Sequence, residues 1–303
     1  MLKYLVTLAY IAVFVNSVFG QKMPHFDAEN AFAYLKTQCD FGPRYPGSAG
    51  HRECLKYLID EFEKYTGHVR QQNFSYPMLN DQQPVTMTNI IASFYPDLTA
   101  RIMLCAHWDT RPWADRDPNP ENRSKPVPGA HDGASGVAVL LELSRILSEN
   151  VPPVGVDIIL FDGEDFGSYG NENSWAIGSR EFAGKQAHLF EPLYAVLLDM
   201  IGDRDQQIYM EQISFRYAPQ ITNKIWQTAA SLGITEFIPE PRYEIMDDHV
   251  RLLNAGIPCV NIIDFDYKYW HTVEDTPDKC SAASLENVGT VLLPLIYENE
   301  DLR

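Results

Sequence analysis

A short apolar run that ends in a cluster of acids constrains the fold of this chain most strongly. Residues 156–161 are apolar except for Asp157, and prolines and glycines bound the run. This length and composition predict a buried strand of a parallel sheet. Asp162, Glu164 and Asp165 follow directly. Because sites in open α/β sheets form beyond the carboxyl ends of strands, we expect these acids to belong to a functional site.

Glu164 and Asp165 are adjacent in the sequence, so their side chains cannot point in the same direction. They therefore suit two tasks, one as a ligand of a metal ion and the other as a group that transfers a proton. Most acidic runs are only solvated loops. The metal-site interpretation is favoured here because other predicted strands also end in metal-binding residue types.

The rest of the chain alternates predicted strands with predicted helices. A polar turn at residues 80–83 is expected to join the first two strands as an antiparallel pair. This pattern predicts an α/β three-layer sandwich with a central mixed, mostly parallel β-sheet flanked by helices. No repeat or linker divides residues 21–303, which we expect to form a single catalytic domain. Strands are predicted at residues 69–76, 88–95, 101–106, 156–161, 193–198 and 257–263. Helices are predicted at residues 28–38, 54–65, 137–147, 179–187, 220–232, 248–253 and 282–297.

The N-terminus is typical of an exported protein. Lys3 precedes an apolar stretch at residues 4–15, and small residues lead to a break after Gly20. This arrangement predicts a secretory signal peptide at residues 1–20 and an exported protein, periplasmic or secreted. The stretch is too short for a typical spanning helix, so no stable membrane insertion is expected after cleavage. The net charge of −17 argues against nucleic acids and anionic membranes as partners.

The chain has five cysteines and no Cys-x-x-Cys pair, so their spacing does not indicate a metal site. An oxidising compartment would allow one or two disulfides and would leave at least one thiol free. The sequence does not determine the pairing. The cysteines are Cys39, Cys54, Cys105, Cys259 and Cys280.

Six acids and imidazoles lie at the ends of predicted strands or in the loops beyond them. Taken alone, each has an ordinary explanation; Asp132, for example, precedes a predicted helix and could cap it. Together they form a set that suits Zn²⁺, which binds imidazole and carboxylate ligands and keeps an open position in catalytic sites. A carboxylate beside a ligand is placed to act as a general base. The six residues are His107, Asp132, Glu164, Asp165, Asp199 and His271.

These residues also carry a family resemblance. The order of His107-x-Asp, Gly-x-His-Asp132-Gly-x-Ser-Gly, Asp-Gly-Glu-Asp165, Leu-Leu-Asp199 and Trp-His271-Thr resembles the zinc aminopeptidase superfamily. Within it, the chain is most similar to the glutaminyl cyclases, or glutaminyl-peptide cyclotransferases, of the animal type and their bacterial members. The resemblance spans residues 40–275. The narrower similarity rests on Arg44-Tyr-Pro-Gly-Ser48, Trp175 before Gly178-Ser179, Asp247-Asp-His249 and Trp270-His271.

The resemblance implies an enzyme that converts an N-terminal Gln of peptides or proteins to pyroglutamate and releases ammonia. It implies one Zn²⁺ ion, held by Asp132, Asp165 and His271. Glu164 would transfer the proton, and Asp199 would provide a catalytic hydrogen bond.

The resemblance also assigns residues around these ligands. Asp247 matches an acid of the cyclase proton network, and Trp175 and Trp270 match walls of the substrate pocket. For Trp270, plain core packing is an equally good interpretation before the resemblance is considered. His107 matches a position that binds a second metal in dinuclear aminopeptidases but not in mononuclear animal cyclases.

The chain departs from the animal cyclases at two places. Asp165 stands where they carry a Glu ligand; the side chain is one methylene shorter, but carboxylate ligation remains possible. Cys105 lies near one position of a disulfide that animal cyclases have beside the site, whereas Val137 occupies the other position, so that disulfide is absent. The segments Asp40-Phe-Gly-Pro-Arg44 and Asp162-Gly-Glu-Asp-Phe-Gly167 resemble bacterial members of the animal-type group and favour a bacterial, periplasmic protein.

Two other functions compete with cyclisation. A dinuclear zinc aminopeptidase would use five ligands, and all five are present. A receptor or scaffold ectodomain that has lost activity is the alternative from another class. The intact ligands and Glu164 argue against it, because an inactive site has no physical need to crowd acids together. The five ligands would be His107, Asp132, Asp165, Asp199 and His271.

Overall fold

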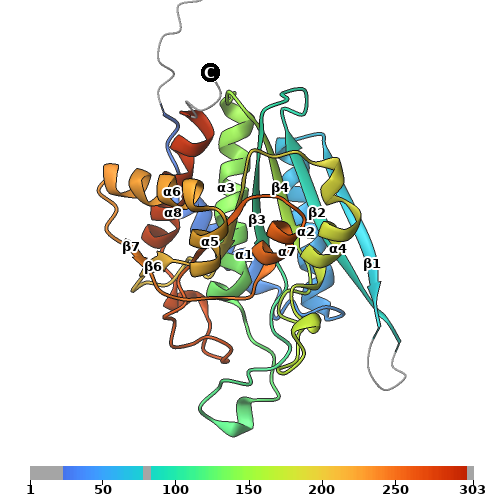
Figure 1. The fold of residues 1–303 in the computed structure, drawn as a ribbon. Helices are drawn as coiled ribbons and strands as arrows, with labels where there is room; N and C mark the ends of the chain where they lie inside the picture. Colours follow the sequence, from blue (N-terminus) through green and yellow to red (C-terminus); the bar gives the residue numbers. More distant parts are fainter. Residues whose placement is uncertain (1–22, 78–82, 299–303) are drawn as a thin grey trace, which may run out of the picture.

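The computed structural model describes residues 23–77 and 83–298, so the predicted signal peptide lies outside the described residues. A six-stranded sheet in the order β1-β2-β4-β3-β5-β8 forms the central layer (Figure 1). Strands β4, β3, β5 and β8 run parallel, whereas β2 is antiparallel to both β1 and β4. The predicted mixed, mostly parallel sheet is therefore confirmed. The strands are β1 (Val69–Tyr76), β2 (Val85–Phe94), β3 (Arg101–His107), β4 (Gly155–Phe161), β5 (Ala195–Asp199) and β8 (Cys259–Ile263).

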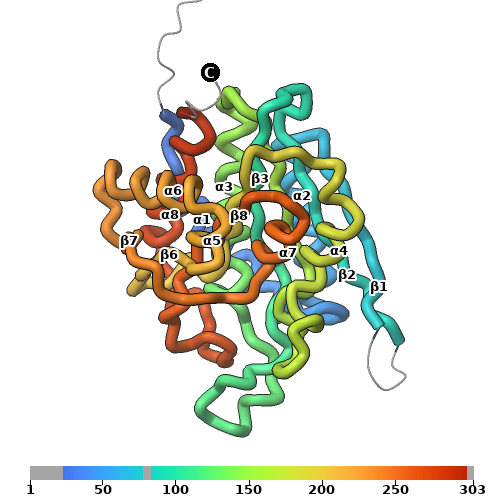
Figure 2. The backbone as a smooth tube through the Cα atoms, viewed as in Figure 1, coloured from blue at the N-terminus to red at the C-terminus, as the bar shows by residue number. Residues whose placement is uncertain are grey.

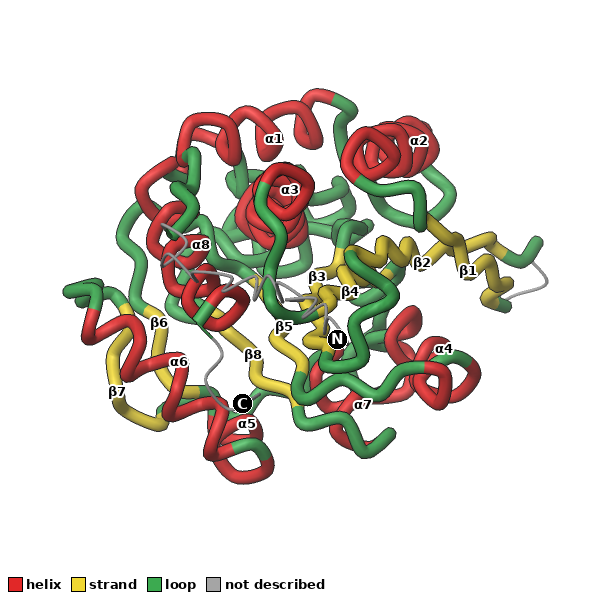
Figure 3. The backbone as a smooth tube through the Cα atoms, turned by 90° about the horizontal axis from the view of Figure 1, so that it is seen from above, coloured by secondary structure: helices red, strands yellow, loops and turns green. Residues whose placement is uncertain are grey.

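Helices cover both faces of this sheet (Figure 3). Helices α1, α2, α3 and α8 lie on one face, and α4 and α7 lie on the other. The structure thus has the three layers that the sequence predicts. Within the described ranges, no helix is both long and apolar enough to cross a bilayer. The helices of the first face are α1 (Ala28–Asp40), α2 (Ala49–Tyr65), α3 (Ser135–Glu149) and α8 (Ala282–Tyr297), and those of the second are α4 (Ile177–Lys185) and α7 (Asp248–Asn254).

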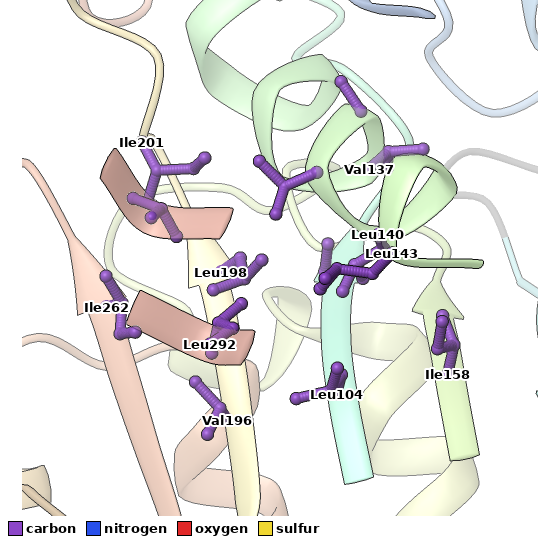
Figure 4. Packing of buried hydrophobic residues seen from close by; sticks show 14 of the residues in the cluster. Leu104, Val137, Leu140, Leu143, Ile158, Val196, Leu198, Ile201, Ile262 and Leu292 are labelled. Carbon is purple, nitrogen blue, oxygen red and sulfur yellow. The ribbon is translucent and has the colours of Figure 1, made fainter. Parts of the chain in front are cut away.

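Helix α3 provides much of the core between the layers. Val137, Leu140 and Leu143 on this helix pack above Leu104 of β3 and Ile158 of β4 (Figure 4). All five side chains are fully buried. Burying a side chain of this kind contributes roughly 1.5–3 kcal/mol, so this layer fixes α3 firmly on the sheet.

A glycine brings the start of α3 close to the end of β5. A Cβ at Gly136 would overlap the carbonyl oxygen of Leu198. Only glycine allows this approach, because any other residue would push the helix away from the strand. The turn that carries Asp132 therefore lies beside Asp199, the last residue of β5.

The largest difference from the predicted helix boundaries is at the start of α2. Helix α2 begins at Ala49, five residues before the predicted start, because the Ser48 hydroxyl accepts the N–H of His51 and caps it.

A second, small sheet of β6 (Ile208–Met210) and β7 (Phe237–Pro241) was not predicted. These strands are too short for an alternation of apolar and polar residues to be recognised, and β7 contains two prolines. The predicted 80–83 turn lies partly outside the described residues. Two further helices are α5 (Gln212–Tyr217) and α6 (Pro219–Ser231).

All five cysteines are free. The disulfides that an oxidising compartment would allow are therefore not formed. Burial raises the pKa of Cys54 to about 12 and that of Cys39 to about 11. Both thiols are consequently poor nucleophiles near neutral pH.

A buried carboxylate, Glu211, connects three segments: the start of α5, the backbone at Ile245 and helix α7. It caps α5 by accepting the N–H groups of Ile213 at 2.9 Å and Ser214 at 2.6 Å. It also accepts the N–H of Ile245 at 3.0 Å and lies 3.1 Å from Nε2 of His249 on α7. Burial raises the pKa of Glu211, but the contacts with His249 and the N–H donors outweigh it and lower the pKa to about 2.

We expect Glu211 to make the stability of the fold depend on pH. Because its folded pKa lies below the ordinary value of 4.5, its contribution is complete above pH 4.5 and is lost as the pH falls toward 2. The difference in unfolding free energy between wild type and Glu211→Gln should shrink by about 2 kcal/mol from about pH 6 to about pH 3. Urea denaturation of the metal-free protein measures this difference. A difference that stays constant over this range would contradict the assignment.

Candidate active site

The predicted site residues meet where the four parallel strands end. His107 is the last residue of β3, Asp199 is the last of β5, and Glu164 and Asp165 follow β4. His271 lies in the loop after β8. The long loop between β3 and α3 projects at the lower end of the molecule in Figure 2 and borders this region. The site thus forms at the carboxyl ends of the strands, as expected for an open α/β sheet.

Asp132 lies in an irregular turn, Ala130–Ala134, and does not cap α3. The helix cap is Ala134, which makes no side-chain cap, and Asp132 itself has extended backbone angles. Gly133 has a φ of +101°, and a Cβ there would lie 2.6 Å from the carbonyl oxygen of Asp109. The glycine therefore lets the turn fold tightly enough to direct Asp132 into the site, and the capping interpretation of Asp132 is wrong.

Asp132, Asp165 and His271 form a group whose ligand atoms lie within 4.8 Å of one another. Nε2 of His271 lies 3.1 Å from Oδ1 of Asp165 and 3.6 Å from Oδ2 of Asp132. All three side chains are buried, and Oδ2 of each aspartate has no hydrogen-bond partner. Buried carboxylate oxygens without partners are costly unless a cation binds them. Two carboxylates and an imidazole therefore fit a zinc ion with an open position.

His107, Asp132 and Asp199 form a second group of the same kind, which shares Asp132 with the first. Nε2 of His107 lies 3.1 Å from Oδ1 of Asp132 and 3.1 Å from Oδ1 of Asp199. All of these side chains are buried. The geometry thus brings together all five ligands that a dinuclear site would need.

Asp109 shapes the loop that carries Glu164. Its carboxylate accepts the N–H of Glu164 at 3.0 Å and that of Asp165 at 3.3 Å, and lies 3.5 Å from Nδ1 of His107. Its main partners are thus the backbone groups of the loop. Asp162, the first residue after β4, accepts the N–H of Thr88 at 2.6 Å and lies 3.0 Å from Nε2 of His51, so it connects the start of the loop to β2 and α2.

Glu164 is partly buried and lines a cavity of about 370 Å³ together with Asp199 and Asp247. Asp247 precedes α7, accepts the amide of Asn261 at 2.6 Å and is buried. Burial, followed by the negative charges of Asp165 and Asp247, raises the pKa of Glu164 well above its usual range. Burial and the charges of Asp199 and Asp248 likewise raise the pKa of Asp247. Carboxyl groups with strongly perturbed pKa values are typical of acid–base sites.

Two indole rings enclose the imidazole of His271. The ring of Trp175 lies parallel to it, with 6.3 Å between centroids and an interplanar angle of 2°. The ring of Trp270 lies closer, with 4.2 Å between centroids and an interplanar angle of 34°. Both indoles are partly exposed and line the cavity, so they form pocket walls and are not buried core residues.

Backbone strain is concentrated at this site. Among the described residues, four non-glycine positions have a φ in the left-handed region. One is His271 itself, and Ala176 and Met200 directly follow Trp175 and Asp199. Such conformations cost about 1–3 kcal/mol each and persist where the surrounding structure enforces them, as at active sites.

Several residues that support the site were not predicted. The carboxylate of Asp275 accepts the N–H of His131 at 2.9 Å and that of Asp132 at 3.2 Å, and so fixes the turn. Arg111 and Asp115 belong to the loop between β3 and α3. Arg111 contacts Asp165, and Asp115 lies beside His271. The unusual length of that loop is the one signal in the sequence that could have indicated a function, because the partners of these residues are far away in the sequence.

Comparisons with known proteins agree with this geometry. The model of peptidase family M28 matches residues 89–296. The glutaminyl-peptide cyclotransferase of Boiga irregularis is 24% identical over 288 residues, which cover 84% of this chain and 77% of that protein. The structure of Bacteroides thetaiotaomicron glutaminyl cyclase bound to N-acetylhistamine has a TM-score of 0.87 and 36% identity, and covers 91% of this chain and 99% of that one. A leucine aminopeptidase precursor from the same organism has a TM-score of 0.88 and 36% identity, and covers 91% and 98%.

Proposed function

The chain belongs to peptidase family M28, and from its similarity to glutaminyl-peptide cyclotransferases we propose that it is a zinc-dependent enzyme of that kind. It acts on peptides and proteins with an N-terminal Gln. The observation that favours cyclisation over hydrolysis concerns Asp247 and Trp270. The zinc ligands are common to aminopeptidases and cyclases, whereas Asp247 and Trp270 belong to the narrower resemblance to cyclases. Both residues line the same cavity as Glu164.

In this reaction the α-amine nitrogen bonds to the carbonyl carbon of its own side-chain amide, and the bond to the amide nitrogen breaks. Glu164 accepts a proton from the α-amine and returns it to the leaving nitrogen, which departs as ammonia. A carboxyl group with a raised pKa suits both transfers. Asp199 and Asp247 line the cavity beside Glu164 and hold the amine by hydrogen bonds. Because the reaction is intramolecular, the chief task of the cavity is to fold the Gln side chain back.

Asp132, Asp165 and His271 hold the zinc ion in this proposal. When bound, zinc supplies Lewis-acid polarisation of the side-chain carbonyl. We propose one ion per chain. His107 already lies within hydrogen-bond distance of oxygens on both Asp132 and Asp199, so those carboxylates have a partner without a second ion.

Trp175 and Trp270 exclude water from the pocket. Their rings lie beside His271 and line the cavity. Exclusion matters because water that attacks the same carbonyl would produce Glu in place of pyroglutamate. The aromatic walls therefore determine which product forms.

Export completes the proposal. The predicted signal peptide at residues 1–20 would direct the chain to the periplasm or outside the cell. Peptides with an N-terminal Gln would meet the enzyme there.

Ammonia release from a Gln-initiated dipeptide tests this function, with hydrolysis of a Leu-arylamide measured in parallel. We expect ammonia release that a heterocyclic chelator abolishes and that added zinc restores, with no arylamide cleavage. Arylamide cleavage without ammonia would make the protein an aminopeptidase and favour a second metal at His107. If the zinc-bound protein showed neither ammonia release nor arylamide hydrolysis, the non-enzymatic alternative would be favoured.

A further inference from the structure

The loop between β3 and α3 contributes a buried cation, Arg111, to the edge of the site. We propose that Arg111 and Asp115 act as a pair of positioning residues. Together they fix the positions of the two zinc ligands, Asp165 and His271, and of the pocket wall Trp175. The inference rests on the proposed zinc site. It goes beyond the proposed function because it assigns a role to residues that contact neither the reacting atoms nor the metal.

Arg111 ties down the chain that carries Asp165. Its side chain is 1% exposed, and Nη1 donates to the carbonyl oxygens of Asp165 at 2.8 Å and Gly167 at 3.1 Å. Its guanidinium also lies 4.5 Å from the ring centroid of Trp175, within the range of a cation–π contact. A single cation thus fixes both a ligand-bearing segment and an aromatic wall.

The other edge of the same guanidinium reaches His271 through Asp115. Nε and Nη2 of Arg111 donate to the two oxygens of Asp115 at 3.0 Å and 2.5 Å. Oδ1 of Asp115 in turn lies 3.5 Å from Nδ1 of His271, on the opposite side of the ring from the zinc-facing Nε2. The hydroxyl of Tyr169 lies 3.4 Å from the same nitrogen. A carboxylate at the free nitrogen of a metal-binding imidazole fixes the orientation of the ring and raises its basicity.

Only an arginine can make these contacts together. Its planar fork pairs with both oxygens of Asp115 while Nη1 donates to two carbonyl groups. Lysine would supply the charge but not the fork.

The test is zinc affinity, measured on the full chain by competition with a chromogenic chelator. We expect Asp115→Asn and Arg111→Met to weaken zinc binding by about 10–100-fold, with Arg111→Lys between them and wild type. Arg101→Met is the matched control. Arg101 forms a similar fork with Asp157, both contacts at 2.8 Å, at the opposite end of β3. We expect it to lower the unfolding temperature but to leave zinc affinity within about 3-fold of wild type.

Three outcomes decide the inference. Weaker zinc binding in Asp115→Asn and Arg111→Met, but not in Arg101→Met, supports it. Wild-type affinity in Asp115→Asn would overturn it, as would equal losses in Arg111→Met and Arg101→Met, since the pair would then only stabilise the fold. If Arg111→Met fails to fold, the near-isosteric Asp115→Asn alone decides. Zinc affinity does not depend on which reaction the enzyme catalyses, so failure here is distinct from failure of the cyclase assignment.

Discussion

Replacing Glu164 with Gln should reduce kcat for cyclisation by about 10²–10⁴-fold. Gln keeps the size of the side chain but cannot accept the proton of the α-amine, so the chemical step loses its general base. Binding of the substrate and of zinc should change little, because Glu164 is not among the three proposed ligands. Steady-state kinetics with a Gln-initiated dipeptide and a zinc determination on the same sample measure both effects.

Glu172→Gln is the matched control for this variant. Glu172 is an exposed acid at the rim of the same cavity, so its replacement removes a nearby charge without removing a proton acceptor. We expect its kcat to stay within about 3-fold of wild type, since an exposed charge is well screened. If Glu164→Gln kept a kcat within about tenfold of wild type, Glu164 would not be the general base.

Replacing His271 with Ala should have a comparably large effect, through loss of zinc. His271 supplies one of three buried ligands, and its Nε2 lies 3.1 Å from Oδ1 of Asp165. Structural zinc sites bind with about 10–16 kcal/mol in total, so one ligand lost corresponds to roughly 10³-fold weaker binding. The variant should lose zinc on dialysis and show no cyclisation, and excess zinc should restore activity only in part.

His249→Ala separates this effect from general damage to the core. His249 is another buried imidazole, but it pairs with Glu211 at 3.1 Å and lies outside both ligand groups. The variant should lose stability and yet keep its zinc through dialysis. Retention of zinc by His271→Ala, or loss of zinc by His249→Ala, would show that the ligand set is wrong.

The sequence predicts the elements that bury an apolar face. Strand β1 has the predicted bounds, although Gln72 is its one buried residue. Helix α8 also has the predicted bounds, because its apolar residues recur at helical spacing over its whole length. The strands β6 and β7 do not have such a pattern. Their pairing depends on contacts with the surrounding structure, which a local period does not reveal.

The candidate site likewise has a part that the sequence predicts and a part that it does not. Asp165 and Asp199 follow apolar strands, so the topology of a parallel sheet is enough to bring them together. The support of the site is not local: Asp275 accepts the N–H of Asp132 across 143 positions of sequence. Arg111 likewise reaches the carbonyl oxygen of Asp165 across 54 positions. No spacing rule connects such pairs, and only the folded structure shows them.

The central claim is that this site closes an N-terminal Gln on itself and leaves the peptide bond intact. Mass analysis of a Gln-initiated peptide after incubation with the zinc-loaded protein tests this claim most directly. We expect a peptide of unchanged length that has lost one molecule of ammonia, and no such product with Glu164→Gln. A peptide shortened by its first residue would contradict the account and identify the protein as an aminopeptidase.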